Sequence, residues 1–300
     1  MSATSLTSLL TSMERQALNR LVLESRYVVE GNLAGRHRSA ARGMSTEFAD
    51  HREYMPGDDP RRIDWKVLGR TERYYVRRYQ DETNLRVYLV VDRSASMNYG
   101  SAAVTKYQYA CRLAAALSYV VIKGRDSVGL YAYSDRVDSA IGARNSFAHL
   151  NNLLGTLAAQ PPASTTATAD ALRRVADDIH RRALIVLISD LFDDPAGIIR
   201  ALAHFRKLHH DVILFHTLDP MELDLDFRRG GEFEDLETNE KIMADPQALM
   251  DEYRQLMGAF IEEYRGAAAR MAIDYRLVRT NQPLDGFVRA YLEERRRLSR

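Results

Sequence analysis

The stretch that decides the fold runs from Leu85 to Met97 and reads LRVYLVVDRSASM. Its first part is an apolar run rich in β-branched residues, which predicts a strand buried on both faces of a sheet. The run stops at Asp92, and Ser94 and Ser96 follow at alternate positions. Open parallel sheets bind ligands beyond the carboxyl ends of their strands, so we expect a binding site here. Oxygen ligands favour a hard cation such as Mg2+, although Asp and Ser after a strand are also ordinary helix caps.

The rest of the chain predicts that this strand belongs to an α/β domain with a doubly wound, mostly parallel sheet. Further strand-like runs occur at residues 127–133, 183–189, 211–217 and 273–278, with an edge strand at residues 136–141. Helical patterns lie between them, the first at residues 102–123. Strands that alternate with helices of this length indicate a largely parallel sheet. The acidic segment 221–243 contains Gly230-Gly231 and predicts a small β-rich insertion rather than a helix.

Composition and charge exclude several classes of function. The chain has 300 residues, of which 42 are basic and 41 acidic, so no global field draws it to nucleic acid or to an anionic membrane. Its longest apolar run, residues 113–122, is shorter than the about 20 residues that span a bilayer. The amino terminus lacks the residue order of a signal peptide, so we expect a cytoplasmic protein. The single cysteine, Cys111, lies in an apolar helical pattern and predicts a core residue.

Two more segments add oxygen side chains to the same predicted edge of the sheet. Asp190 follows the strand at residues 183–189, and the loop before a predicted helix offers the hydroxyls of Ser164, Thr165, Thr166 and Thr168. The ends of strands 85–91 and 183–189 can be neighbours in this topology, so we expect Asp92 and Asp190 to lie close together. Mg2+ takes six ligands and usually keeps some from water or substrate. A metal held partly by neutral hydroxyls should therefore accept an incoming carboxylate.

This order of motifs resembles the metal-ion-dependent adhesion site of von Willebrand A-type domains. The motifs are Asp92-x-Ser94-x-Ser96, then Thr166-x-Thr168, then an apolar strand that ends in Ser189-Asp190. The resemblance implies that Ser94 and Ser96 bind the metal directly. It implies that Thr166 binds the metal in some ligand states of the site and not in others. It also implies that Asp92 and Asp190 hold the ion directly or through water. The implied cofactor is Mg2+, or Mn2+ or Ca2+ in its place.

A second and longer pattern precedes the first strand. It consists of Gly43, Glu47-Phe48, Arg52, Tyr54, Pro56-Gly57-Asp58-Asp59, Arg61, Ile63-Asp64-Trp65, Arg70 and Glu82. It is similar to the signature of the bacterial family called domain of unknown function 58, and the likeness extends over about residues 28–292. The resemblance implies a MoxR-type AAA+ ATPase, or a client protein of that ATPase, as the partner. An acidic side chain of this partner would then bind the metal.

The signature block carries interleaved opposite charges around the only tryptophan of the chain. Such a run is a solvated face by default, and the block would then be a structural, salt-bridged subdomain. An aromatic side chain among Arg and Asp is also typical of protein-binding hot spots, so a docking surface is an equal alternative. The residues of that surface are Arg52, Tyr54, Asp58, Asp59, Arg61, Asp64, Trp65 and Arg70.

We therefore divide the chain into five segments: a tail and helix at residues 1–27, an accessory subdomain at 28–84, the A-type domain at 85–219, the insertion at 220–244, and a helix, strand and helix at 245–300 that complete the domain. The first functional hypothesis is a non-enzymatic, Mg2+-dependent adaptor in protein maturation or remodelling. The second is a Mg2+-dependent phosphoester or related hydrolase, although the chain has no Walker loop and no G-x-S-x-G serine. The third is a metal-free scaffold.

Overall fold

The computed structural model describes residues 48–55, 63–71, 73–79, 85–162, 167–224, 231–234, 241–244 and 246–298. The chain divides into two compact units. The smaller unit is Val29–Asn84, and the larger unit comprises Met1–Val28 and Leu85–Arg300. The tail and helix that we predicted at residues 1–27 lie outside the described residues.

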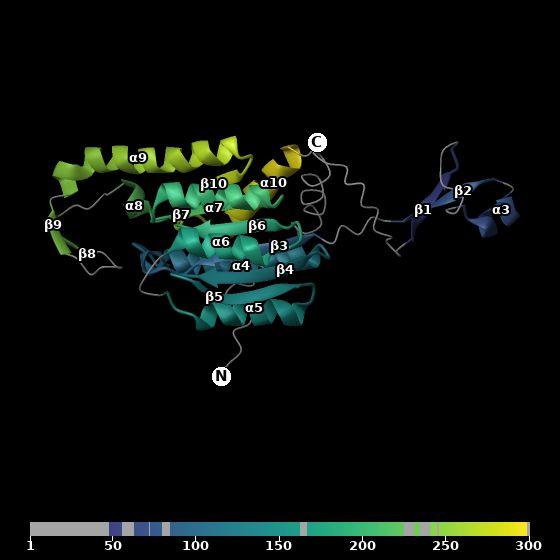
Figure 1. Cartoon of the computed structure of the whole chain (residues 1–300), viewed down its shortest axis with the longest axis horizontal. Helices are drawn as coiled ribbons and strands as arrows, with labels where there is room; N and C mark the ends of the chain where they lie inside the picture. Colours follow the sequence, from purple (N-terminus) through teal and green to yellow (C-terminus); the bar gives the residue numbers. More distant parts are fainter. Residues whose placement is uncertain are drawn as a thin grey trace. The chain divides into compact units, whose positions relative to one another are not determined.

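A six-stranded, mostly parallel sheet is the centre of the larger unit (Figure 1). Its strands are β3 (Arg86–Asp92), β4 (Ser127–Tyr133), β5 (Val137–Arg144), β6 (Leu184–Ser189), β7 (Asp211–Leu218) and β10 (Asp274–Arg279). Their order is β10-β7-β6-β3-β4-β5. The edge strand β5 pairs antiparallel with β4, whereas the other neighbouring strands pair in parallel. This arrangement confirms the predicted α/β class with a doubly wound, mostly parallel sheet.

Helices pack on both faces of this sheet. On one side lie α4 (Lys106–Lys123), α5 (Phe147–Ala159) and α10 (Leu284–Leu298). On the other side lie α6 (Thr168–Asp178), α7 (Pro195–Lys207) and α9 (Pro246–Arg270). Helix α4 begins four residues later than predicted because Thr105 and Gln108 cap it reciprocally, each side chain accepting a hydrogen bond from the other's backbone N–H. This cap fixes Lys106 as the first residue of the helix.

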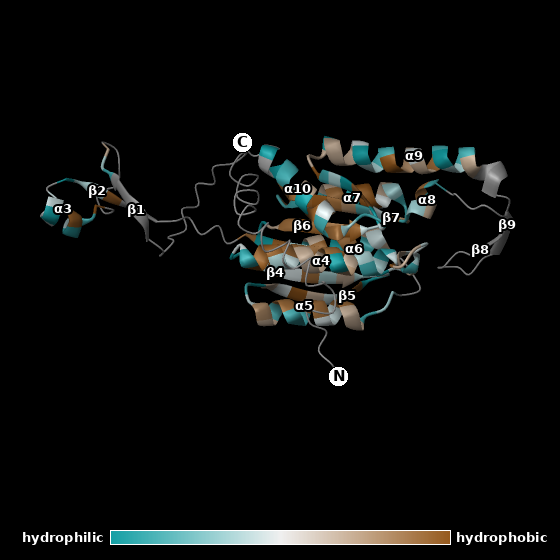
Figure 2. Ribbon diagram, turned by 180° about the vertical axis from the view of Figure 1, so that it is seen from behind, coloured by the Kyte–Doolittle hydropathy of each residue, from teal (hydrophilic) through white to brown (hydrophobic). Residues whose placement is uncertain are grey.

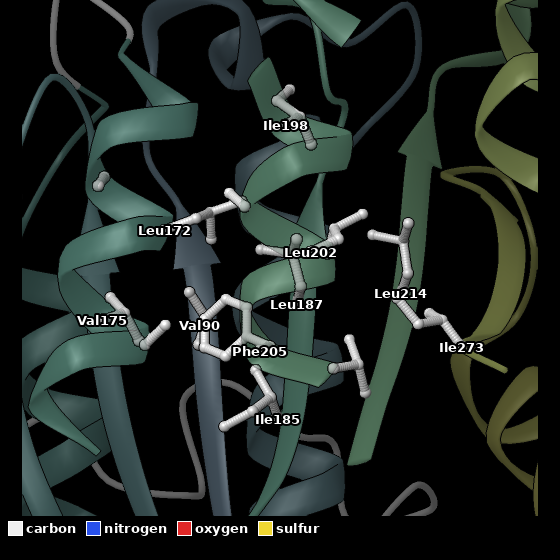
Figure 3. Packing of buried hydrophobic residues seen from close by; sticks show 14 of the residues in the cluster. Val90, Leu172, Val175, Ile185, Leu187, Ile198, Leu202, Phe205, Leu214 and Ile273 are labelled. Atoms are coloured by element: carbon white, nitrogen blue, oxygen red, sulfur yellow. The ribbon is translucent and has the colours of Figure 1, made fainter. Parts of the chain in front are cut away.

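The central strands β3, β6 and β7 are buried along most of their length, as their apolar runs predict. In Figure 2 the hydrophobic colour follows β6 and much of α4. Figure 3 shows the core between the sheet and helices α6 and α7, with labelled side chains Val90, Leu172, Val175, Ile185, Leu187, Ile198, Leu202, Phe205, Leu214 and Ile273. A close-packed core of this kind holds the carboxyl ends of the strands in fixed positions.

The segment after β7 differs from the prediction. Pro220–Asp224 forms a short helix, α8, where we expected no helix. Its start is stabilised by capping, because Asp219 Oδ1 accepts a hydrogen bond from the N–H of Met221 at 2.9 Å. The Glu222 side chain in turn accepts one from the N–H of Asp219 at 2.9 Å. The β-rich part comes later, where β8 (Gly231–Glu234) pairs antiparallel with β9 (Lys241–Ala244).

The smaller unit is built on two antiparallel strands. Strand β1 (Phe48–Glu53) pairs with β2 (Tyr75–Tyr79), and helix α3 (Trp65–Thr71) comes between them in the chain. Ile63 forms an isolated bridge with Val76, and both side chains are buried. These two apolar residues anchor the start of α3 to the strands.

Candidate metal centre at the strand ends

Asp92 is the last residue of β3 and is completely buried. Its Oδ2 accepts hydrogen bonds from the Ser189 hydroxyl at 2.6 Å and from the Tyr133 hydroxyl at 3.2 Å. Its Oδ1 accepts one from the N–H of Ser94 at 2.9 Å. The donors come from β6, from β4 and from the turn after β3, so three parts of the sheet edge fix this carboxylate.

Ser94 and Ser96 lie in the turn directly after Asp92. The chain here forms a short 3-10 helix, Ala95–Asn98, and the two hydroxyl oxygens lie 3.0 Å apart. Ser94 is buried and Ser96 is partly exposed, so the pair reaches from the interior towards the surface. Ser94 precedes the 3-10 helix but its side chain makes no capping hydrogen bond. The Ser94 hydroxyl therefore does not cap this helix, although helix capping was the alternative role for these serines.

Asp190 follows β6 directly and is 1% exposed. Its Oδ2 accepts a hydrogen bond from the ammonium of Lys106 at 2.7 Å. The same ammonium lies 2.5 Å from Oε1 of Glu222 in α8, and 4.7 Å from the ring centroid of Phe192. Lys106 is fully buried. One of the predicted metal ligands is thus already paired with a cation of the protein itself.

Lys106 is not among the residues predicted from the sequence, although the sequence holds a signal for it. The helix dipole disfavours a cation at the amino end of a helix. Lys106 is the first residue of α4, and that helix is buried over most of its length. A lysine at such a position indicates a buried acidic partner.

The buried charges shift one another's proton affinity. Burial, and then the negative charge of Asp190, raise the pKa of Asp92 to about 7, although hydrogen bonds from Ser189 and Ser94 act to lower it. Burial acts to lower the pKa of Lys106, but attraction by Asp190 and Glu222 raises it above its ordinary value. Lys106 is therefore cationic at neutral pH, and it neutralises only part of the acidic charge at the strand ends.

The turn that carries Asp190 is held by aromatic side chains from the neighbouring elements. His216 of β7 donates from Nε2 to the carbonyl oxygen of Asp190 at 2.9 Å, and its Nδ1 accepts from the Tyr275 hydroxyl at 2.8 Å. The Tyr264 hydroxyl of α9 donates to the carbonyl oxygen of Leu191 at 3.2 Å. Leu191 has a φ of 60°, which is uncommon for a residue other than glycine. These hydrogen bonds therefore stabilise a strained turn next to the candidate ligand.

Thr166, the fifth predicted ligand, lies outside the described residues. Thr168 begins α6, and its N–H donates to Asp193 Oδ2 at 2.8 Å. Its hydroxyl is buried and has no hydrogen-bond partner among the residues that the structure describes. The start of α6 therefore brings one buried hydroxyl into the interior that no described residue binds.

The residues present fit a hard divalent cation. Two adjacent ligands of an octahedral Mg2+ ion lie roughly 3 Å apart, which is the separation of the Ser94 and Ser96 oxygens. Burial and then the negative charge of Asp190 raise the pKa of Asp92, and a cation would offset that negative charge. Within the described ranges, no three His, Cys, Asp or Glu side chains are grouped so that they could hold a metal. Hydroxyl oxygens would therefore have to supply part of the ligand set.

The predicted docking surface of the smaller unit is described only in part. Asp58, Asp59 and Arg61 lie outside the described residues, and for Arg52 the structure describes the backbone alone, in β1. The Tyr54 ring is half-buried and lies 6.3 Å, centroid to centroid, from the ring of Tyr74. The contribution of these residues to a docking surface stays a prediction.

The remaining three residues of that surface surround the start of α3. Asp64 is buried, and its Oδ1 accepts hydrogen bonds from the N–H groups of Lys66 at 3.0 Å and Val67 at 3.4 Å. Asp64 therefore caps the helix. Trp65 is 62% exposed and Arg70 is also exposed, so both side chains are available to a partner.

The strand order defines an α/β domain with a mostly parallel sheet, and an acidic and hydroxyl cluster lies at the ends of its central strands. The chain belongs to the family described as "Protein of unknown function DUF58", whose model matches residues 50–259. It is 33% identical over 215 residues to two uncharacterized proteins, Mb1516 of Mycobacterium bovis and Rv1480 of Mycobacterium tuberculosis. The matched part is 70% of this chain and 66% of each relative, so the chain spans just under two thirds of the length of these relatives.

Comparison with solved structures gives matches at low sequence identity. BatB from Bacteroides thetaiotaomicron is 14% identical with a TM-score of 0.47, over 71% of this chain and 99% of that chain. The SpRpn10 VWA domain is 11% identical with a TM-score of 0.42, over 69% of this chain and 94% of that chain. Among the described residues, no helix combines the length and the apolar character that crossing a membrane requires.

Proposed function

We propose that this protein is a non-enzymatic interaction protein that binds an acidic side chain of a partner through a divalent cation. The observation that supports it best is the pair of hydroxyl oxygens of Ser94 and Ser96, 3.0 Å apart at the partly exposed end of a buried carboxylate cluster. In this proposal Ser94, Ser96 and Thr166 bind the ion, while Asp92 and Asp190 hold it directly or through water. When bound, Mg2+ supplies an open coordination position for a carboxylate.

The proposed partner is a MoxR-type AAA+ ATPase or a client protein of that ATPase, and the process is protein maturation or remodelling in the cytoplasm. This part of the proposal rests on the family resemblance. The exposed side chains of Trp65 and Arg70 would form a second contact, because tryptophan and arginine are enriched at binding hot spots. A partner with acidic side chains suits both the metal and the arginine.

A pull-down from a cell lysate tests the metal dependence of this interaction. The full chain is immobilised, and the retained proteins are identified with Mg2+ present and with a chelator present. We expect an AAA+ ATPase or its client to be retained with Mg2+ and lost with the chelator or with Ser96→Ala. Ser134→Ala is the matched control, because this serine also lies just after a strand, but its hydroxyl donates a hydrogen bond to Asp138. If the partner is retained equally with the chelator and by the Ser96→Ala variant, the proposed metal-dependent contact is refuted.

A metal-free scaffold is the second candidate function. The observation that favours it is the Lys106 ammonium, which already neutralises Asp190 at 2.7 Å. In that case partner binding would persist with the chelator and would depend on Trp65 instead. The hydrolase hypothesis stays a prediction from the sequence.

A further inference from the structure

The ammonium of Lys106 is fixed by contacts with two carboxylates and two aromatic rings. Its ammonium contacts one carboxylate of the loop after β6 and one of α8, at 2.7 Å from Asp190 and 2.5 Å from Glu222. The faces of Phe192 and Tyr99 lie near the ammonium, with ring centroids at 4.7 Å and 6.0 Å. The side chain is 0% exposed, so bulk water does not screen its charge. The ammonium therefore acts as a fixed cation next to Asp190.

A divalent cation at the strand ends needs the negative charge of the same Asp190. The pairing of Oδ2 with Lys106 leaves Oδ1, which accepts one long hydrogen bond, from the N–H of Phe192 at 3.3 Å. An ion that took either oxygen would lie within a few ångströms of the ammonium, where two positive charges in a poorly screened interior repel strongly. The two cations therefore oppose each other through one carboxylate.

Glu222 pairs with the ammonium at the same time as Asp190 does. Its helix, α8, is fixed by the Asp219 cap, and Asp219 also accepts hydrogen bonds from Ser101 and from the Thr280 hydroxyl at 3.0 Å. The Tyr253 hydroxyl of α9 donates to the carbonyl oxygen of Glu222 at 2.7 Å. Lys106 can thus give up Asp190 without becoming an unpaired buried charge, whose cost would be high.

We propose that Lys106 is an internal competitor of the divalent cation at Asp190 and sets the metal affinity of the site. This inference rests on the proposed metal-dependent function. Lys106 stabilises the metal-free state, and the metal binds when the ammonium releases Asp190 and stays paired with Glu222. Metal binding by the free protein is then weak, and a carboxylate from a partner, which adds a further ligand, strengthens it. Metal and partner should bind cooperatively.

Calorimetric titration of the full chain with Mn2+ alone tests the competition. Lys106→Met removes the charge and keeps the side-chain length, and we expect it to bind Mn2+ about tenfold more tightly than the wild type, or more, because it removes a close repulsive charge. Glu222→Gln leaves the ammonium with Asp190 alone and should weaken Mn2+ binding several-fold. Lys123→Met, the same substitution at an exposed lysine at the other end of α4, should leave the affinity unchanged. If Lys106 had only a structural role, its removal would instead weaken Mn2+ binding.

The outcomes separate this inference from the proposed function. If the wild type binds Mn2+ and Lys106→Met binds it no more tightly, this inference is wrong and the proposed function stands. If neither the wild type nor any variant binds Mn2+, both are wrong. Should Lys106→Met not fold without metal, its thermal unfolding is measured at increasing Mn2+ concentrations, and its Tm is expected to rise more steeply with Mn2+ concentration than that of the wild type. If Lys106→Met does not fold under either condition, the test is the Mn2+ affinity of Glu222→Gln. Unchanged or tighter Mn2+ binding by Glu222→Gln overturns the inference.

Discussion

The ammonium of Lys106 lies 2.7 Å from the carboxylate of Asp190, and their side chains are 0% and 1% exposed. The pair joins the first turn of α4 to the loop after β6. Removing one partner of a buried ion pair leaves an uncompensated charge, which is far more costly than losing an exposed pair. The relationship therefore links the stability of the larger unit to the chemistry of the candidate metal centre.

Lys106→Met should destabilise the protein when no metal is present. It leaves the carboxylates of Asp190 and Glu222 buried without their cation, and a loss of about 3–5 kcal/mol in the free energy of unfolding is typical of such a change. Urea unfolding followed by circular dichroism, with a chelator present, measures it. Lys123→Met, at an exposed position of the same helix, should change the free energy by less than about 0.5 kcal/mol. Equal stability of the two variants would contradict the structural role of Lys106.

Asp64→Ala should destabilise the smaller unit by removing the cap of α3. The loss of a capping side chain costs about 1 kcal/mol, and Asp64→Asn should retain most of the stability because its side-chain oxygen can still accept the two backbone hydrogen bonds. Trp65 is the only tryptophan of the chain, so its fluorescence during urea unfolding reports on this unit. If both variants unfold at the same urea concentration as the wild type, Asp64 does not act as the cap.

Trp65→Ala should leave the fold intact and weaken partner binding. The side chain is 62% exposed, so its removal should change the free energy of unfolding by less than about 0.5 kcal/mol. Capture of the partner in the pull-down should fall by at least about tenfold if Trp65 is a hot spot. Phe147→Ala, at an exposed aromatic of the larger unit, is the control and should not affect capture. Loss of folded protein in Trp65→Ala would favour the structural interpretation of the signature block.

His216 should make the protein less stable in acid. Burial lowers the pKa of His216 to about 4, against 6.5 for the unfolded chain, so between these values the unfolded state binds a proton that the folded state does not. The contribution of His216 to stability is therefore complete above pH 6.5 and is lost as the pH falls to about 4. The whole effect is about 3 kcal/mol.

The raised pKa of Asp92 acts in the opposite direction over part of this range. The contribution of His216 is therefore measured as the difference between the wild type and His216→Gln, which keeps an amide donor for the carbonyl of Asp190. The destabilisation of the variant relative to the wild type should be largest near neutral pH and should shrink towards pH 4. A difference that does not depend on pH would contradict the neutral, buried histidine.

The sequence predicts the position of Asp92 and Asp190 well, because two apolar runs ending in acidic residues define adjacent parallel strands. It does not predict Lys106, whose acidic partners lie 84 and 116 positions away in the chain. Pattern analysis detects neighbours along a helix or strand, and this contact depends on how α4 and α8 pack. Helix α8 was missed for a different reason. Its reciprocal cap, Asp219 with Glu222, is a local signal, but the acidic, glycine-containing segment after it favoured a β-rich interpretation.

The role of Asp64 also needed the structure. In the sequence it is one of many interleaved charges, and its selection as a helix cap depends on the chain direction at Ile63, which the bridge to Val76 sets. Trp65 is its direct neighbour and is exposed. One residue of the block therefore serves the fold while the next is available for binding, a distinction that composition alone does not make.

The most direct test of the proposed metal centre is a calorimetric titration of the purified full chain with Mg2+. We expect one ion per chain for the wild type, a loss of affinity of at least about tenfold in Ser96→Ala, which removes a direct ligand, and no change in the control Ser134→Ala. Absence of saturable Mg2+ binding by the wild type, or equal affinity in Ser96→Ala, would contradict a metal centre at Ser94 and Ser96.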